Sequence, residues 1–364
     1  MFSGFPAILA WLSILFSHQM AVLIVGRVVS GFCCSLCSAN CSLLVAQYSS
    51  TNRRGGFLSL YMVMSGIGVL ISYTLGAALT WRYVAVFPTI LYIIMITCLL
   101  VVPESPLWLL THKTLDEAIE ALSWLRVAED VLDEINTLEE ARENKNHALT
   151  VTQAIINLSR KDIRKPFILI LINFLFAMFA GPFIIIFYAV TILSSSGLAD
   201  EHVHIAAIAV ELCMVIGGVL SIFFIQRLPR TRVAMISMTA MSLSMALLGT
   251  SLYVPEILGG QILPLVCTMV FMFSFGAGAG PLQWVFMGEL LPPEYKVLAG
   301  ILVSLGTIAI FITTKLFHFM EEVLHLYGVF WLLAGISALS NIFYATCMPE
   351  TKGKTLLEIR KLFA

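Results

Sequence analysis

Two ionisable residues, Glu211 and Lys315, lie inside long apolar stretches of the sequence. A charged side chain in apolar surroundings is energetically costly, so such residues often mark a functional site. Glu211 lies about two helical turns from the end of its stretch. Its carboxyl group could hold a proton or a cation, or a neighbouring group or a water molecule could satisfy it. Lys315 lies within about one turn of an end, where its long side chain can reach polar surroundings. Glu211 is therefore the candidate ion site.

The other reactive residue types form no catalytic or metal-binding pattern. The seven histidines lie mainly at the ends of apolar stretches, and the eight cysteines lie inside them, unlike a secreted disulfide framework. Cys34, Cys37 and Cys41 share a helical face, which favours small-residue helix packing over a soft-metal site. There is no phosphate-binding loop, and the net charge of −1 gives no electrostatic case for a nucleic-acid partner. We expect no enzyme activity, no cofactor and no metal.

The composition indicates a membrane protein. Apolar residues make up 59% of the 364 positions and charged residues 12%, and the mean hydropathy is +0.94. An average soluble domain has about 25% charged residues, and a membrane-spanning helix needs roughly 20 mostly apolar ones. Period-two alternation is absent, which excludes barrel strands. The expected spans, the first of them short, are about 4–17, 20–46, 57–79, 84–102, 167–194, 204–225, 233–254, 261–288, 297–319 and 327–348.

Lysine and arginine residues concentrate in one set of loops and in the C-terminal tail, which predicts that both termini are cytoplasmic. The polar insert 103–166 belongs to the same side. Within it, Thr114 with Glu117 forms a capping box, and Thr150 with Gln153 has the same spacing. We expect amphipathic helices from 114, around 129–143 and from 150. A solvated linker with transient helices is the alternative.

Two short signatures recur at nearly the same offset along the chain. Gln47 is followed seven positions later by Arg54, as Glu289 is by Lys296, and the Pro-Glu-Ser of 103–105 returns as a Pro-Glu-Thr. Parallel repeats of this kind build one group of secondary transporters, which hold the substrate between two bundles. The alternative is chance recurrence at helix ends. The repeat predicts two further spans before Met1.

The predicted domains follow from this repeat. They are a four-helix membrane bundle over 1–102, the cytoplasmic insert over 103–166, a six-helix bundle over 167–348 and a cytoplasmic tail over 349–364.

Several motifs, in order along nearly the whole chain, resemble the sugar porters of the major facilitator superfamily, and among them the insect trehalose transporters. The motifs are Gly26-Arg27, Arg54-Gly55, Pro103-Glu104-Ser105-Pro106, Gly278-Ala279-Gly280-Pro281 leading to Trp284, Glu289, Thr314-Lys315-Leu316-Phe317 and Pro349-Glu350-Thr351-Lys352-Gly353-Lys354-Thr355-Leu356. The resemblance implies an all-α fold of twelve helices, about ten of them present here, that works by alternating access.

The resemblance also implies two sets of functional residues. It assigns a charge latch, which breaks and reforms as the bundles rock, to Arg27, Arg54, Glu104, Arg227, Arg230, Glu289, Lys296 and Glu350. Charges solvated at the headgroups are the alternative for these residues. It assigns a substrate site around the aromatic ring of Trp284 to Trp284, Gly181, Gly280, Pro281, Phe183 and Met62.

The chain departs from the family pattern at this site. The family's sugar-binding amides align with Ala177, Met178, Phe183, Met62 and positions near Val303 and Thr307. Each hydrogen bond left unmet with a buried sugar costs about 1–3 kcal/mol, so an ordinary hexose or disaccharide is in doubt as substrate.

The leading hypothesis is a plasma-membrane facilitator that moves a small solute, a trehalose- or hexose-like sugar, and whose partners are that solute and the lipid bilayer. The alternatives are a transport-inactive relative acting as a sensor or docking protein, and a proton-coupled symporter that uses Glu211.

Overall fold

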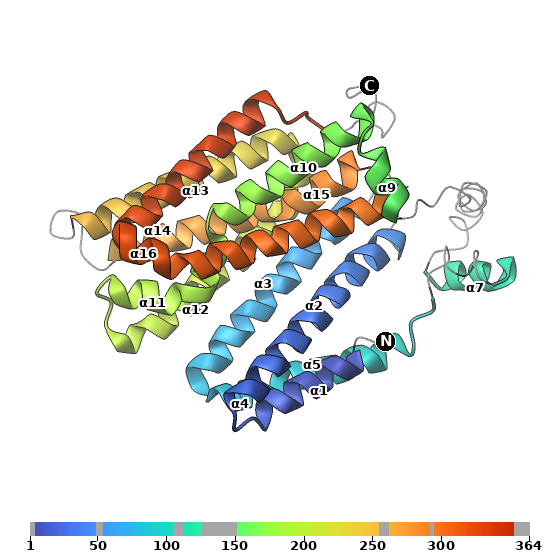
Figure 1. The fold of residues 1–364 in the computed structure, drawn as a ribbon, viewed down its shortest axis with the longest axis horizontal. Helices are drawn as coiled ribbons and strands as arrows, with labels where there is room; N and C mark the ends of the chain where they lie inside the picture. Colours follow the sequence, from blue (N-terminus) through green and yellow to red (C-terminus); the bar gives the residue numbers. More distant parts are fainter. Residues whose placement is uncertain are drawn as a thin grey trace. The chain divides into compact units, whose positions relative to one another are not determined.

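The computed structural model describes residues 4–48, 54–104, 109, 113–125, 151–254, 262–291 and 295–352, and over these residues it is helical without strands (Figure 1). The membrane helices are α1 (Gly4–Leu15), α2 (Met20–Tyr48), α3 (Arg54–Ala78), α4 (Trp81–Val84), α5 (Val86–Leu99), α10 (Lys161–Phe179), α11 (Pro182–Ser195), α12 (Asp200–Arg227), α13 (Arg230–Tyr253), α14 (Ile262–Ser274), the π-helix η2 (Phe275–Ala279), α15 (Gly280–Leu290) and α16 (Lys296–Thr346). This confirms the predicted all-α class.

Eight of the described segments are long and apolar enough to cross a membrane, and the shorter apolar helix α1 precedes them. Four of the eight contain a break: Trp81–Leu99 joins α4 and α5, Ile262–Leu290 holds η2 between α14 and α15, and two more are irregular. Helices α10 and α11 together form the segment Lys161–Ser195, and α16 changes direction at His325, where φ is 57° and ψ is 166°. Because α16 therefore holds two of the predicted spans, all ten predicted spans are found among the described residues.

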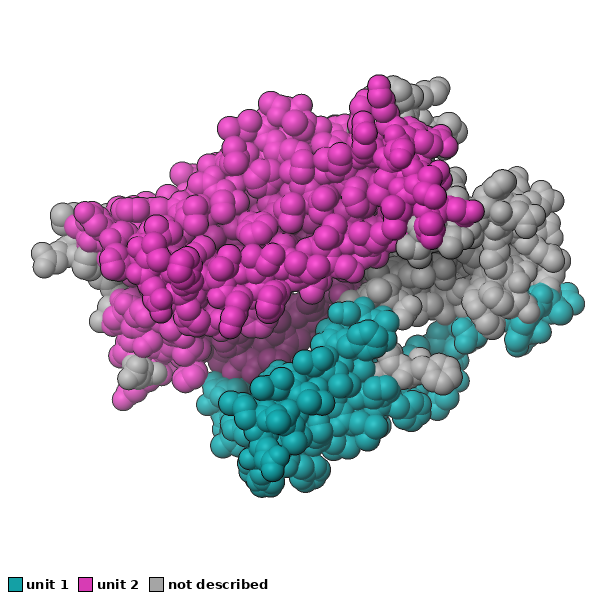
Figure 2. Space-filling model, viewed as in Figure 1, with its two compact units in different colours: residues 1–57, 75–148 teal, residues 58–74, 149–364 magenta. Residues whose placement is uncertain are grey.

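The chain forms two compact units (Figure 2). Unit 1 comprises residues 1–57 and 75–148, and unit 2 comprises residues 58–74 and 149–364. The middle of α3 thus groups with the second unit. The reason is local packing, since Gly66 and Val63 of α3 lie against Met214, Val215 and Gly218 of α12.

In unit 1, α1 packs against α2 and α5, and α4 lies at the start of α5. The contact of α1 with α2 is close, because a Cβ atom on Gly26 would lie 2.7 Å from Ile14 and 2.8 Å from Ser13. The predicted helix of the insert is present as α7 (Leu115–Leu125). The backbone N–H of Glu117 donates to the Thr114 hydroxyl at 3.5 Å. The helix expected around 129–143 lies outside the described residues.

Unit 2 holds the larger core. Helix α13 packs along α16 and α14, α10 packs on α16, and α12 packs on α14 and η2. The last insert helix, α9 (Val151–Asn157), also contacts α16. Large apolar side chains such as Phe271, Phe275, Phe286 and Phe330 are fully buried there. This bundle positions Trp284, Glu211 and the acidic residues of the sequence motifs.

Candidate functional site

The ring of Trp284 on α15 is held between two other aromatic rings of unit 2. Tyr61 of α3 contacts it edge-on, with ring centroids 5.5 Å apart, and Phe174 of α10 does so at 5.8 Å. Edge-to-face aromatic pairs add about 0.5–1.5 kcal/mol beyond the area they bury. The indole Nε1–H of Trp284 is buried and has no acceptor among the described residues. The site therefore presents a fixed aromatic face and an unused donor.

The helix that carries Trp284, α15, is preceded directly by the π-helix η2. A π-bulge leaves backbone groups unpaired, and such bulges are frequent at functional sites. Here the hydroxyl of Ser237 on α13 donates to the Ser274 carbonyl at 2.7 Å and accepts from the Ala279 N–H at 3.0 Å. One serine thus satisfies two backbone groups of the bulge and ties it to α13.

The bulge also lies very close to α12. A Cβ atom on Gly276 would lie 2.2 Å from the Met214 carbonyl oxygen, and one on Gly217 would lie 2.3 Å from the Phe273 carbonyl oxygen. No side chain fits at either distance, so the two backbones touch through paired glycines. Small residues allow this kind of contact between membrane helices.

The second break in unit 2 lies at Gly181, between α10 and α11. Its φ of 97° is in the left-handed region that favours glycine, and Pro182 follows at the first position of α11. A Cβ atom on Gly181 would lie 2.6 Å from Leu333 of α16. The predicted site residue Gly181, with Pro182 after it, therefore shapes the backbone, and the predicted residue Phe183 packs half-buried against the core.

The positions aligned with the family's sugar-binding amides have largely apolar surroundings. Ala177 and Met178 are buried in the core at 1% and 3% exposure, and Met62 lies beside Gly280. Thr307 is exposed, and its hydroxyl donates within its own helix to the Val303 carbonyl at 2.9 Å. Of the predicted substrate residues, Met62, Gly280 and Trp284 thus lie in one region, between α3 and α15.

Two buried amide side chains each have one polar atom without a hydrogen-bond partner among the described residues. They are Gln283, which precedes Trp284, and Asn173, which precedes Phe174. Gln283 is 2% exposed, and its Oε1 has no donor among the described residues. Asn173 accepts a 2.6 Å hydrogen bond from the hydroxyl of Tyr344, but its Nδ2 has no acceptor there. The bond joins α10 to α16. Gln283 was missed, although a polar residue directly before the key tryptophan was a usable signal.

Glu211 lies near the middle of α12 and is fully buried, with 0% exposure. Neither of its carboxyl oxygens has a hydrogen-bond partner among the described residues. The sequence left open whether a neighbouring group satisfies this carboxyl group. No described side chain does so.

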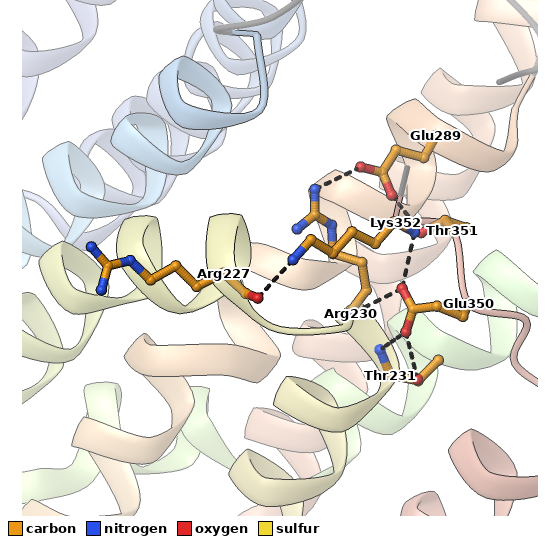
Figure 3. A network of polar contacts seen from close by, with 7 residues as sticks. All are labelled: Arg227, Arg230, Thr231, Glu289, Glu350, Thr351 and Lys352. Atoms are coloured by element: carbon orange, nitrogen blue, oxygen red, sulfur yellow. Dashed lines mark hydrogen bonds and ion pairs between the residues drawn. The ribbon is translucent and has the colours of Figure 1, made fainter. Parts of the chain in front are cut away.

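Most of the charged motif residues of unit 2 meet at one end of the bundle (Figure 3). The guanidinium of Arg230 lies 3.3 Å from the carboxylate of Glu289 at the end of α15. The other Glu289 oxygen accepts a hydrogen bond from the hydroxyl of Thr351. The Nζ of Lys352 donates to the Arg227 carbonyl at 2.7 Å. We call these residues, together with Thr231 and Glu350, the polar cluster.

Glu350 acts as the N-terminal cap of α13. Its carboxylate accepts the backbone N–H groups of Arg230 at 2.9 Å and Thr231 at 3.1 Å, and the Thr231 hydroxyl at 2.7 Å. Helix N-termini favour negative charge because their first N–H groups are unpaired.

These contacts also set the protonation of Glu350. Burial alone would raise the pKa of Glu350, but the hydrogen bonds from Lys352, Thr231 and Arg230 outweigh it, so the pKa is lowered. Glu350 thus contacts the backbone N–H of Arg230, while the guanidinium of Arg230 pairs with Glu289. Thr231, Thr351 and Lys352 were not singled out, although each lies in or beside a motif that was.

The remaining predicted latch residues lie elsewhere. In unit 1, the Arg27 guanidinium is 5.5 Å from the ring centroid of Trp11, and Glu104 is exposed. The guanidinium of Arg227 points away from the polar cluster (Figure 3). The side chains of Arg54 and Lys296 are outside the described part, so their place in the charge latch stays a prediction.

Comparison with known proteins places these features in a family. Residues 1–363 match the family model described as sugar (and other) transporter. A facilitated trehalose transporter, Tret1, of Apis mellifera ligustica is 30% identical over 369 residues, which cover 100% of this chain and 73% of that protein. The Tret1 of Polypedilum vanderplanki is 30% identical over 371 residues, covering 98% and 71%.

Solved structures match the fold. The proton:xylose symporter XylE with bound 6-bromo-6-deoxy-D-glucose has a TM-score of 0.83 at 18% identity, covering 100% of this chain and 82% of that one. XylE of E. coli in a partially occluded inward-open conformation has a TM-score of 0.77 at 19% identity, with 97% and 79% covered. The chain therefore has the major facilitator fold. It is a multi-pass membrane protein that belongs to the sugar transporter family, a family of transporters and not of enzymes.

Proposed function

We propose that the chain carries a sugar of the trehalose or glucose type across the plasma membrane by alternating access, with both termini in the cytoplasm. The observation that carries this proposal is the Trp284 site. A sugar binds best where its apolar ring face can stack on an aromatic ring while its hydroxyls meet polar atoms. Trp284 offers both, since its ring is fixed by Tyr61 and Phe174 and its N–H has no partner in the described part.

The choice of sugar rests on the relatives. Two of them are named as facilitated trehalose transporters, and each is 30% identical to the chain. Because the family's amides are replaced around Met62, Ala177 and Met178, the remaining polar atoms of Gln283 and Trp284 would orient the substrate. We therefore expect weaker and less selective sugar binding than a full set of amides would give.

The breaks in unit 2 supply the moving parts of this proposal. Broken helices are tolerated in membranes where they line a cavity or a binding site. The break at Gly181 follows α10, which carries Phe174, and the bulge η2 directly precedes α15, which carries Trp284. Local rotation at these points would open or close access to Trp284 while the packed remainder of each helix moves as a rigid element.

The polar cluster would act as the charge latch of this cycle. It joins the start of α13, the end of α15 and the segment after α16. Two further guanidinium nitrogens of Arg230, Nε and Nη1, are buried without acceptors among the described residues. An acceptor that comes and goes during rocking would fit these donors, because charge-assisted hydrogen bonds are strong yet reversible.

Uptake by proteoliposomes tests this function. The reconstituted full chain is given radiolabelled trehalose or glucose, and uptake is compared with protein-free vesicles and with a Trp284→Ala variant. We expect faster uptake of at least one sugar with the native chain and a large reduction with Trp284→Ala. Uptake equal to that of protein-free vesicles for both sugars would refute the proposal.

A further inference from the structure

Glu211 is a buried acid in the middle of the membrane domain that the Trp284 site leaves unused. Its exposure on α12 is 0%, and both of its oxygens lack donors among the described residues. A buried carboxylate without a partner is strongly unfavourable, whereas a carboxylic acid is much less so. The proton is therefore the simplest ligand for this group in the conformation described.

Among the described residues, no side chain forms a hydrogen bond or ion pair with the carboxyl group of Glu211. Tyr73 of α3 is close enough to Glu211 to interact with it electrostatically. The remaining titratable side chains of the neighbouring helices include Tyr188 of α11, which donates to the Thr314 carbonyl, Cys267 of α14 and Cys213 of α12 itself. Arg227, Arg230 and Glu289 belong to the far end of the bundle, in the polar cluster.

The hydroxyl of Tyr73 is bound elsewhere. It donates a 2.6 Å hydrogen bond to the carbonyl oxygen of Ile186 in α11. Two residues later α11 departs from helical geometry at Tyr188, with φ −122° and ψ 16°. Tyr73 thus holds α3 to the kinked part of α11, and its O–H is not donated to Glu211.

We propose that Glu211 is a proton-binding site that couples sugar movement through this transporter to proton movement. The inference rests on the proposed function, because it needs a cycle in which the two sides of the membrane reach the site alternately. When the site opens to water, the O–H bond of the acid breaks, its electron pair stays on the carboxylate, and the proton passes to water. When the site closes, the carboxylate must regain a proton or a partner before it is buried again.

Sugar-driven proton movement tests the inference. Vesicles that contain the full chain and a trapped pH indicator are given a trehalose or glucose gradient without an initial pH difference. Exchange of labelled sugar at equal concentrations on both sides is measured in parallel, because exchange needs sugar transport but no net proton movement. We expect protons to enter with the sugar.

Substitutions assign the effect to Glu211. Glu211→Gln keeps the size and hydrogen-bonding capacity of the protonated acid, so exchange should persist while the proton signal is lost. Glu201→Gln, the same change at an exposed position on the same helix, should leave both intact. If the Glu211→Gln protein does not fold, Glu211→Asp replaces it. Proton entry should then depend on pH over a different range in Glu211→Asp than in the native chain, and an unchanged range would overturn the inference.

Each outcome separates the two proposals. Exchange without proton entry in the native chain, or proton entry that survives Glu211→Gln, would overturn the inference and leave the proposed function standing. Absence of exchange in the native chain with both sugars would overturn the proposed function, and the inference with it.

Discussion

At the residue scale, the indole N–H of Trp284 is a hydrogen-bond donor that finds no acceptor among the described residues. Buried polar groups in folded proteins are nearly always paired, so an unpaired one calls for a ligand or a second conformation. The carboxyl oxygens of Glu211 and the Oε1 of Gln283 are likewise buried without a hydrogen-bond partner among the described residues. These three side chains are therefore where the chemistry of substrate and proton recognition is expected.

Substitution of Trp284 by phenylalanine separates stacking from hydrogen bonding. Trp284→Phe keeps an aromatic ring against Tyr61 and Phe174 but removes the N–H. Loss of one hydrogen bond, about 0.5–1.5 kcal/mol, should raise the KM for trehalose exchange about two- to tenfold without a comparable fall in stability. Trp331→Phe is the control, since the N–H of Trp331 already donates to Thr250. An equal rise of KM in both variants would contradict this role.

The depressed pKa of Glu350 predicts how stability depends on pH. A carboxylate with a lowered pKa stabilises the fold above its unfolded pKa, about 4.3 for glutamate, and this contribution is lost as pH falls through the folded pKa. Glu350→Gln should thus lower the thermal unfolding midpoint in detergent at pH 7, and the gap from the native chain should shrink below about pH 4. The exposed Glu322→Gln serves as control. A gap that does not change with pH would argue against the capping role.

At the element scale, the sequence predicted where the membrane helices lie but not where they break. Hydropathy marks 167–194 as one span, yet the chain turns at Gly181 because that residue adopts φ 97°. The π-bulge at Phe275–Ala279 could not be predicted from the sequence either. Its backbone groups bond to Ser237, which lies on a helix far away in sequence. Hydropathy reports lipid contact, whereas breaks depend on tertiary partners.

Ser237→Ala tests whether the bulge needs its bridging hydroxyl. The change leaves the Ser274 carbonyl and the Ala279 N–H without their partner, at a cost of about 1–3 kcal/mol. We expect a lower unfolding midpoint and slower sugar exchange, because the helix that carries Trp284 loses its link to α13. Ser244→Ala on the same helix removes only bonds to its own turn and should have a smaller effect. Equal effects of the two changes would refute the bridge.

Gly276→Ala tests the close contact of α12 with η2. A methyl group there would lie 2.2 Å from the Met214 carbonyl oxygen, which belongs to rigid backbone. The helices must separate, so we expect little monodisperse protein on size-exclusion chromatography in detergent. Gly335→Ala is the control, since nothing lies within 4 Å of the added methyl group. Normal yield and stability of Gly276→Ala would show that this contact is not needed.

At the scale of the whole molecule, the sequence was sufficient for the class of fold and for the family. Long apolar stretches and ordered motifs such as Pro349-Glu350-Thr351-Lys352 are local signals, and the family match over residues 1–363 confirms them. The division into units was less predictable. Residues 58–74 belong with unit 2 because Gly66 packs on Met214 and Val215, a contact between segments far apart in the chain.

The central claim is that the chain moves a sugar by exposing one site to each side of the membrane in turn. Counterflow measures this directly, with proteoliposomes preloaded with unlabelled trehalose and diluted into a trace of labelled trehalose. We predict a transient accumulation of label above its equilibrium level, absent from vesicles preloaded with mannitol. Label that only equilibrates, at the rate seen without protein and for glucose as well as trehalose, would contradict the account.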